Sequence, residues 1–208
     1  ALHMEGHGSG TPVATIPFGV WPEEFQATWP PGPPIFFHLG SMDWLPNEEG
    51  IRWLLRHVWP KVVEKHPGAQ LHLAGNRMPK DLVRTRLPGS TVTGRVPDAL
   101  RYLAHRHVML VPLFSAGGMR VKIIEGMAMG KPVISTPIGA EGINYTEGLN
   151  ILIGRNATEF AQHIIALDEA PDYMHMLGKN ARALIETQYT DESTVRILVD
   201  LFERLLKA

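Results

Sequence analysis

VMLVPLFSAGGMRVKIIEGMAMGKPVISTPIGAEG, residues 108–142, is the stretch that decides the fold. It predicts a buried strand, a Gly-Gly turn, a helix that carries Arg120, Lys122 and Glu125, a second buried strand and another glycine-rich loop. Glycines at a helix start let the backbone approach a ligand, and the free N–H groups and helix dipole there favour an anion. The two cations suit a phosphate or diphosphate, and Glu125 can reach a hydroxyl group beside it. The pattern therefore indicates a nucleoside diphosphate ligand at the carboxyl end of a parallel sheet.

The same alternation extends from residue 35 to about residue 167. The apolar runs are short and lack polar alternation, which is typical of strands buried on both faces. We expect strands at 35–39, 71–74, 91–92, 108–112, 132–136 and 150–153. We expect helices from Asn47 to about Val63 with a kink at Pro60, and at 79–86, 97–105, 119–129, from 158, at 171–188 and at 191–206. The fold class is α/β, a Rossmann-like doubly wound parallel sheet.

The first 34 residues differ from the rest of the chain. ALHMEGHGSG is rich in Gly and His, and WPEEFQATWPPGPP, residues 21–34, is rich in proline. This composition predicts an extended or loosely ordered tail. Between the two parts, TPVATIPFGV (residues 11–20) is a short apolar segment that could form a strand.

The overall composition excludes several classes of protein. Net charge is −1, so the whole molecule has no field that favours nucleic acid or an anionic membrane. There is no cysteine, which excludes disulfides and thiol chemistry. No apolar run approaches the ~20 residues of a membrane span, and no signal core is present at the N-terminus. We therefore expect a cytoplasmic protein without a transmembrane segment.

Four stretches carry a resemblance to a known family. They are FFHLGSMDWLPNEEGIRWLL (36–55), LHLAGN (71–76), VTGRVPDALRYL (92–103) and PLFSAGGMRVKIIEGMAMGKPVISTPIGAEGI (112–143). In order and spacing they resemble the C-terminal, donor-binding domain of group 1 glycosyltransferases with the GT-B fold. VATIPFGV resembles the interdomain crossover of these enzymes, with Phe18 in place of the usual Asn. The resemblance implies that residues 1–34 are tail and crossover, that residues 35–208 are the donor domain, and that the N-terminal acceptor-binding domain is absent from this chain.

Members of that family transfer a sugar from a nucleoside diphosphate donor to an acceptor hydroxyl, usually with retention and without a metal. The resemblance implies no cofactor, a nucleotide-sugar substrate and a role in polysaccharide or glycan assembly, with possible peripheral membrane association of the full-length enzyme. It assigns Glu125 to the ribose hydroxyls. Gly117 stands where many relatives have a first glutamate, and the loop SMDWLPNEEG (41–50) lacks their basic pair. Arg120 and Lys122, in a G-x-R-x-K-x-x-E pattern, are expected to replace that charge as the catalytic cations.

The remaining predicted donor contacts come from the loops at the same sheet edge. They are Gly40 and Ser41, Arg95 and Val96 near the base, Gly117, Gly118 and Met119, and Gly139 and Ala140. Each has an ordinary alternative, such as a tight turn, a helix cap or a surface charge. Arg120 and Lys122 are two residues apart and should not share a helix face, which weakens the case for one of them.

Histidine and tryptophan suggest little beyond packing. No H-E-x-x-H pattern or Cys/His cluster is present, so no metal site is expected. His38 is expected to be a core histidine with satisfied hydrogen bonds. Trp53 and Trp59 are expected to pack in the core, and Trp44 is the one tryptophan expected to face the ligand.

Two other functions stay open at this point. A nucleotide-sugar epimerase-like enzyme would share the fold, but it needs carboxylates and a histidine in the cleft. A non-catalytic nucleotide-binding module would bind without transfer, and the missing glutamate at position 117 keeps it open. On the glycosyltransferase interpretation, we expect this chain alone to bind donor weakly and not to turn over.

Overall fold

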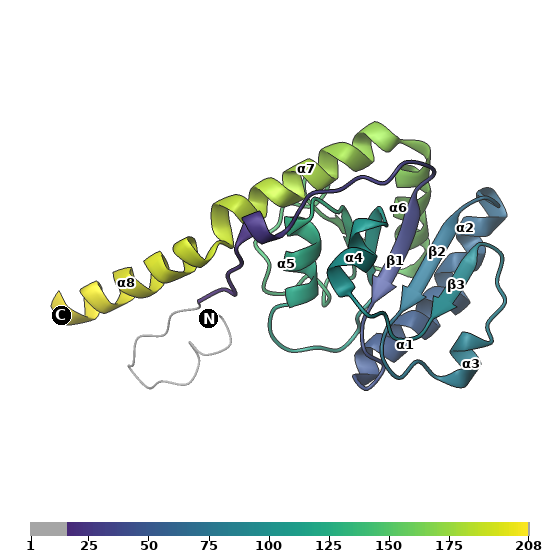
Figure 1. Cartoon of the computed structure of the whole chain (residues 1–208), viewed down its shortest axis with the longest axis horizontal. Helices are drawn as coiled ribbons and strands as arrows, with labels where there is room; N and C mark the ends of the chain where they lie inside the picture. Colours follow the sequence, from purple (N-terminus) through teal and green to yellow (C-terminus); the bar gives the residue numbers. More distant parts are fainter. Residues whose placement is uncertain (1–15, 208) are drawn as a thin grey trace.

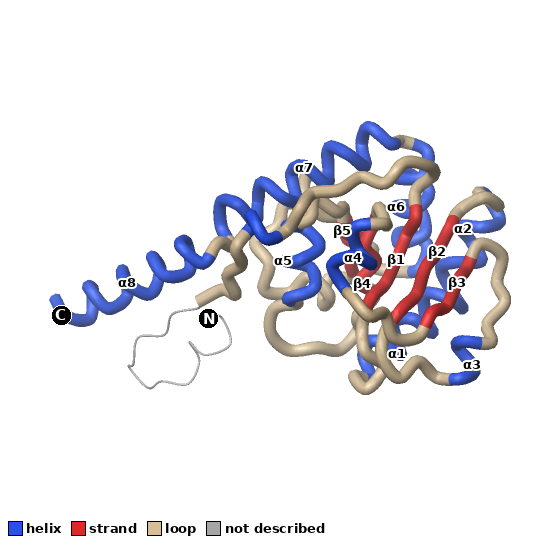
Figure 2. Tube along the Cα trace, viewed as in Figure 1, coloured by secondary structure: helices blue, strands red, loops and turns tan. Residues whose placement is uncertain are grey.

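The computed structural model describes residues 16–207, and its centre is one six-stranded parallel sheet in the order β3-β2-β1-β4-β5-β6 (Figure 2). The strands are β1 (Ile35–Leu39), β2 (Gln70–Ala74), β3 (Ser90–Thr93), β4 (Val108–Val111), β5 (Val133–Ser135) and β6 (Leu152–Ile153). Their positions and the doubly wound α/β class confirm the prediction. Strand order reverses direction between β1 and β4, and ligands of such sheets bind where the loops after these two strands diverge.

Helices cover both faces of the sheet (Figure 1). They are α1 (Leu45–Trp53), α2 (Trp59–Lys65), α3 (Lys80–Val83), α4 (Ala99–Ala104), α5 (Val121–Ala128), α6 (Ala157–Glu169), α7 (Pro171–Gln188) and α8 (Asp191–Lys207). One hydrophobic cluster joins the sheet to α1, α2 and α6, and the other joins it to α4, α5 and α7. The two clusters make the sheet an interior layer, which explains why its strands are continuous apolar runs.

The first long helix is interrupted, as Pro60 predicted. A π-helical turn, η3 (Leu54–Val58), separates α1 from α2. Proline has no N–H and its ring clashes with the carbonyl one turn earlier, so the regular ladder cannot pass through it. The apolar side of the helix stays continuous across the break, since Ile51, Leu54, Val58 and Val62 are all fully buried.

Residues 16–34 are mainly extended, which is one of the two alternatives predicted for the N-terminal segment, and they are held against the rest of the fold. They include a short 3-10 helix, η2 (Pro22–Glu24), and run along α7 (Figure 1). Buried or part-buried cations donate to their backbone carbonyls: Lys131 to Thr28, and Arg182 to Phe25 at 2.7 Å. A proline-rich segment has few N–H donors of its own, but its carbonyls remain free to accept.

The strand that residues 11–20 could form is not present in the described part of that segment. Residues 11–15 lie outside the described part of the chain, and residues 16–20 contribute one isolated bridge, Val20 to Thr190. That bridge fixes the crossover-like segment to the start of α8.

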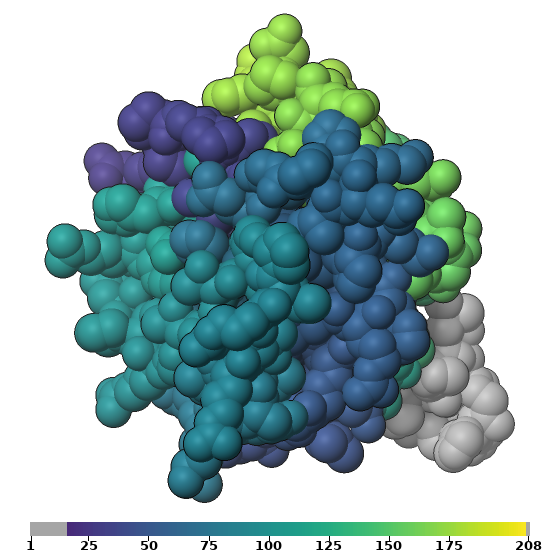
Figure 3. Space-filling view, turned by 90° about the vertical axis from the view of Figure 1, so that its right-hand side faces the viewer, coloured from purple at the N-terminus to yellow at the C-terminus, as the bar shows by residue number. Residues whose placement is uncertain are grey.

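The two ends of the sheet differ in what lies beyond them. Figure 3 views the molecule from the β3 edge, where α2, β2, β3 and α3 make the surface in blue and teal. At the opposite end, α8 projects away from the body beside the N-terminal segment (Figure 1). It exposes an apolar face that includes Val199 and Phe202. None of the helices in residues 16–207 is both long and apolar enough to cross a membrane.

Candidate diphosphate-binding site

The loop between β4 and α5 opens toward solvent at its two glycines. Gly117 and Gly118 are exposed, and a Cβ atom built on either would meet nothing within 4 Å. Gly118 has φ +76°, a conformation that side chains with a Cβ rarely adopt. Met119 packs beside Gly142 of the loop after β5. The backbone here leaves space for a ligand next to the N-terminus of α5.

Arg120 and Lys122 converge, although a regular helix would separate them. The helix begins at Val121 and not at residue 119 as predicted, so Arg120 is its N-cap with extended backbone (φ −87°, ψ 95°). Its guanidinium donates to the Gly118 carbonyl through Nη2. The Trp44 ring centroid lies 5.8 Å from the Arg120 guanidinium and 5.9 Å from the Lys122 ammonium. Because Arg120 stands outside the helix, the objection that the two cations cannot serve one ligand no longer applies.

Neither cation is neutralised by the protein. Arg120 is 6% exposed and its Nε has no hydrogen-bond partner. Within residues 16–207, no ion pair joins Arg120 or Lys122 to a carboxylate. Burial, and then the charge of Arg120, lower the pKa of Lys122 to about 7. Burial also lowers the pKa of Arg120, and the charge of Glu141 opposes that shift. A buried and a half-buried cation that form no ion pair among the described residues are costly to the fold, and an anionic ligand would reduce that cost.

Glu125 lies further along α5 and is half-buried. Burial raises the pKa of its carboxyl group. No hydrogen bond or ion pair of its side chain is found in the part of the chain that the structure describes. A half-buried carboxylate without a partner can accept two hydrogen bonds, which suits a vicinal diol.

A pocket of about 200 Å³ adjoins this cluster at the ends of β1 and β2. It brings together three of the predicted residues, Gly40, Ser41 and Val96, with Leu39, Gly75, Asn76 and Ala99. Arg95 is exposed and does not line it. The pocket has the position expected for a base or ribose.

The loop after β5 uses its own N–H groups. Gly139 donates to the Thr136 hydroxyl at 3.1 Å, and Ala140 donates to the Thr136 carbonyl at 3.1 Å. A Cβ atom at Gly139 would lie 2.3 Å from the Ser135 hydroxyl. In this structure these two residues close a turn against the sheet, so their amides are not available to a ligand as predicted.

A larger hollow of about 420 Å³ follows α4, and its lining includes Val96, Tyr102 and Arg106. Arg106 stacks on the Tyr102 ring at 3.7 Å. The unpaired buried cations lie elsewhere, at the start of α5, so size alone does not identify the site.

Sequence reasoning missed one member of the cluster, Asn47, and the unpaired nitrogen of another, His38. Asn47, at the start of α1, accepts from the Lys122 ammonium at 2.7 Å. His38 is buried as predicted, but only Nδ1 is paired, donating to the Leu110 carbonyl at 2.8 Å, while Nε2 has no partner. The available signal for Asn47 was that it is an amide within the loop 41–50, which has no basic residue of its own.

The two tryptophans of the first helical segment pack against the core. Trp59 is fully buried and donates to the Pro88 carbonyl, and Trp53 packs edge-on against Phe114 and Phe160, which confirms their core roles. No group of three His, Asp or Glu side chains in residues 16–207 is placed to hold a metal ion.

Known structures share this architecture. Sucrose-phosphate synthase from Thermosynechococcus elongatus superposes with a TM-score of 0.71 at 22% identity, over 92% of this chain and 52% of that one. Anabaena Alr3699/HepE in complex with UDP-glucose superposes with a TM-score of 0.60 at 19% identity, over 84% of this chain and 49% of that one. The C-terminal domain of the group 1 glycosyl transferase LpcC from Francisella tularensis superposes with a TM-score of 0.64 at 16% identity, over 83% of this chain and all of that domain. At these identities the likeness establishes the fold.

The sequence comparisons identify the family. An uncharacterized 44.6 kDa protein in the cps region of Klebsiella pneumoniae is 25% identical over 162 residues, which are 73% of this chain. The chain spans 41% of that protein's length. The family model for group 1 glycosyl transferases matches residues 33–169, more than half of the chain. The chain belongs to the group 1 glycosyl transferase family.

Proposed function

We propose that this chain is the donor-binding half of a glycosyltransferase that uses a nucleoside diphosphate sugar. The observation that carries the proposal is a pair of cations, the buried Arg120 and the half-buried Lys122, which form no ion pair with a carboxylate in residues 16–207 and stand beside an open Gly-Gly loop. A diphosphate supplies two negative charges and acceptor oxygens at the same place. The N-terminus of α5 adds free N–H groups and a favourable dipole.

The proposed chemistry is electrostatic. The acceptor hydroxyl oxygen bonds to the anomeric carbon and gives its proton to the departing diphosphate oxygen. The bond from that carbon to the diphosphate oxygen breaks and leaves its electron pair on the diphosphate. Arg120 and Lys122 stabilise the charge that grows there. Glu125 holds the ribose hydroxyls, and the pocket at Gly40, Ser41 and Val96 takes the base. Transfer proceeds with retention and without a metal.

Two comparisons support finer parts of this proposal. The HepE structure holds UDP-glucose on the same fold, which makes a uridine donor the first to test. The Klebsiella relative lies in a cps region, which supports polysaccharide assembly as the setting. The acceptor site belongs to a separate domain, and this chain spans only 41% of the length of the Klebsiella relative.

Isothermal titration calorimetry with UDP, GDP, ADP and dTDP tests the proposal. We expect one nucleotide to bind selectively and the binding to be lost in Arg120→Met and reduced in Glu125→Gln. Arg155→Met, which removes an exposed, paired arginine, is the matched control and should bind normally. If the wild-type chain binds none of the four, the proposal is contradicted.

A second candidate is a nucleotide-binding module without transfer activity. Gly117, an exposed glycine where many related enzymes have a glutamate, favours it. Joining the chain to its acceptor domain and assaying sugar transfer separates the two functions. The proposed enzyme transfers sugar in that assay and this chain alone does not, whereas the module binds nucleotide and is inactive in both forms.

A further inference from the structure

Asn47 connects the two walls of the candidate site. It is 4% exposed, although it lies in the first turn of α1 next to an exposed loop. Its Nδ2 donates to the Ser41 carbonyl at 2.9 Å, and its Oδ1 accepts from the Lys122 ammonium at 2.7 Å. One amide therefore joins the loop after β1 to the first turn of α5.

The surroundings of Asn47 hold it in one place. A Cβ atom on Gly40 would lie 2.6 Å from Asn47 Nδ2, so residue 40 must be glycine for the amide to fit. A Cβ atom on Gly50 would lie 2.0 Å from the Pro112 carbonyl oxygen, which shows how closely α1 approaches the segment before α5. Both glycines make room for this junction, and Gly40 has a packing reason independent of any ligand.

The groups that face Lys122 are neutral or positive. His38 donates from Nδ1 to Leu110, and burial together with the Lys122 charge lowers the pKa of His38 to about 3, so its ring is uncharged. Arg120 adds a second positive charge nearby. The acceptor for the ammonium is an amide oxygen, which fixes the direction of Lys122 without cancelling its charge. An aspartate in the same position would cancel it.

We propose that Asn47 is the positioning residue that presents the Lys122 ammonium to the diphosphate of the donor. This inference rests on the proposed function. It goes further by explaining how a flexible four-carbon side chain is held in line with Arg120, and why the acceptor is an amide and not a carboxylate.

A double-mutant cycle on UDP binding tests it, with Asn47→Ala, Lys122→Met and the two combined. We expect Asn47→Ala to weaken UDP binding about tenfold, in keeping with one charge-assisted hydrogen bond. In the Lys122→Met background the same change should matter less than about twofold, because Asn47 acts through the lysine. Additive losses would overturn the inference, since they indicate a general structural role.

Asn47→Asp gives a second readout, the pH dependence of UDP-glucose binding, which a purely structural role of Asn47 would leave unchanged. The carboxylate keeps the shape and the acceptor but pairs with Lys122. We expect weaker UDP-glucose binding that no longer changes between pH 7 and 8.5, where the wild-type affinity falls. A wild-type pH profile in Asn47→Asp would overturn the inference.

Asn150→Ala is the matched control. Asn150 is also buried, at 6% exposed, and accepts from the Thr146 amide away from the cations. Loss of stability with unchanged UDP affinity is expected there. If wild type binds UDP and Asn47→Ala binds equally well, this inference alone fails. If wild type binds no nucleotide, the proposed function fails and takes the inference with it.

Discussion

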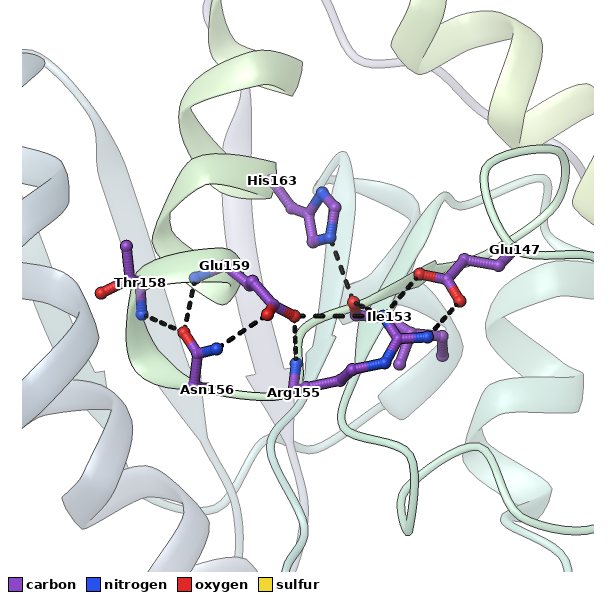
Figure 4. A network of polar contacts seen from close by, with 7 residues as sticks. All are labelled: Glu147, Ile153, Arg155, Asn156, Thr158, Glu159 and His163. Atoms are coloured by element: carbon purple, nitrogen blue, oxygen red, sulfur yellow. Dashed lines mark hydrogen bonds and ion pairs between the residues drawn. The ribbon is translucent and has the colours of Figure 1, made fainter.

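Two arginines at the carboxyl edge of the sheet, each beside a helix N-terminus, show opposite arrangements. Arg155, after β6, is half exposed and forms a bidentate pair with Glu147 at 2.6 and 2.9 Å (Figure 4). Its backbone N–H donates to Glu159, and Asn156 caps α6. Arg120, before α5, is buried and has no carboxylate partner among residues 16–207.

The comparison teaches which charges belong to the fold and which await a ligand. Arg155 has water and carboxylates around it, so its network is complete without any other molecule. Arg120 and Lys122 have lost much of their water and form no ion pair among residues 16–207, and only the charge of Glu141 partly offsets that of Arg120, so the free protein bears the cost.

The largest expected effect is on nucleotide affinity. Arg120→Met keeps the apolar stem and removes the charge, and we expect UDP binding to weaken roughly 100-fold, because a buried charge contact to the diphosphate is lost. Arg155→Met should change UDP binding less than about twofold. Calorimetric titration measures both. Equal losses in the two variants would mean that net charge, and not the buried site, attracts the nucleotide.

The next effect is a pH dependence that only the buried pair should show. With a pKa of about 7 in the free protein, Lys122 is mostly neutral at pH 8.5 and must take up a proton to bind an anion. UDP-glucose affinity should fall about tenfold from pH 7 to 8.5. UDP-glucose is the probe because its diphosphate does not titrate in this range. Lys122→Met should give a flat profile, and a fall of the same size in that variant would exclude Lys122 as the cause.

The stability of the free protein should respond in the opposite direction. Burial lowers the Lys122 pKa below its unfolded value, so the folded state binds fewer protons between these two values. The free energy of unfolding should therefore rise as pH increases through 7 toward 10. Urea unfolding of wild type and Lys122→Met across this range measures the contribution, which should be missing in the variant.

A smaller effect is expected from the carboxylate of α5. Glu125→Gln keeps the shape but weakens the acceptor, and UDP binding should fall about fivefold. The loss should be smaller for 2′,3′-dideoxy-UDP, which lacks the diol. An equal loss for both nucleotides would place Glu125 away from the ribose.

The smallest effect is expected in the paired network. Glu147→Gln removes one exposed partner of Arg155, and such pairs contribute little in water. Its melting temperature should change by about 2 °C or less, with UDP affinity unaffected. A large loss of UDP binding would show that the two arginine regions are coupled.

The sequence was sufficient for the sheet because its strands are unbroken apolar runs between turn signals. That Arg120, Lys122 and Glu125 lie close together was also predictable, since they follow a Gly-Gly pair at the start of one short helix. Asn47 was not, because its contact with Lys122 joins positions 75 residues apart and depends on tertiary packing. Helical periodicity also misled, since it assumed that Arg120 lies inside α5.

Composition predicted an N-terminal segment that is extended or loosely ordered, but it could not show what holds residues 16–34 in place. A high proline content shows that a segment has few N–H donors. Residues 16–34 are held in place through their carbonyl groups, which proline content does not reveal. Lys131 and Arg182, more than 100 residues later, supply the donors. Neither side of such a contact carries a local signal.

The most direct test of the central claim is thermal unfolding of wild type and Arg120→Met, each with and without UDP. The claim is that the buried cation is held at a cost to the fold for the sake of an anionic ligand. We expect the free variant to melt at least about 2 °C higher than free wild type, and UDP to raise the melting temperature of wild type only. A variant that melts lower and is still stabilised by UDP as wild type is would contradict the account.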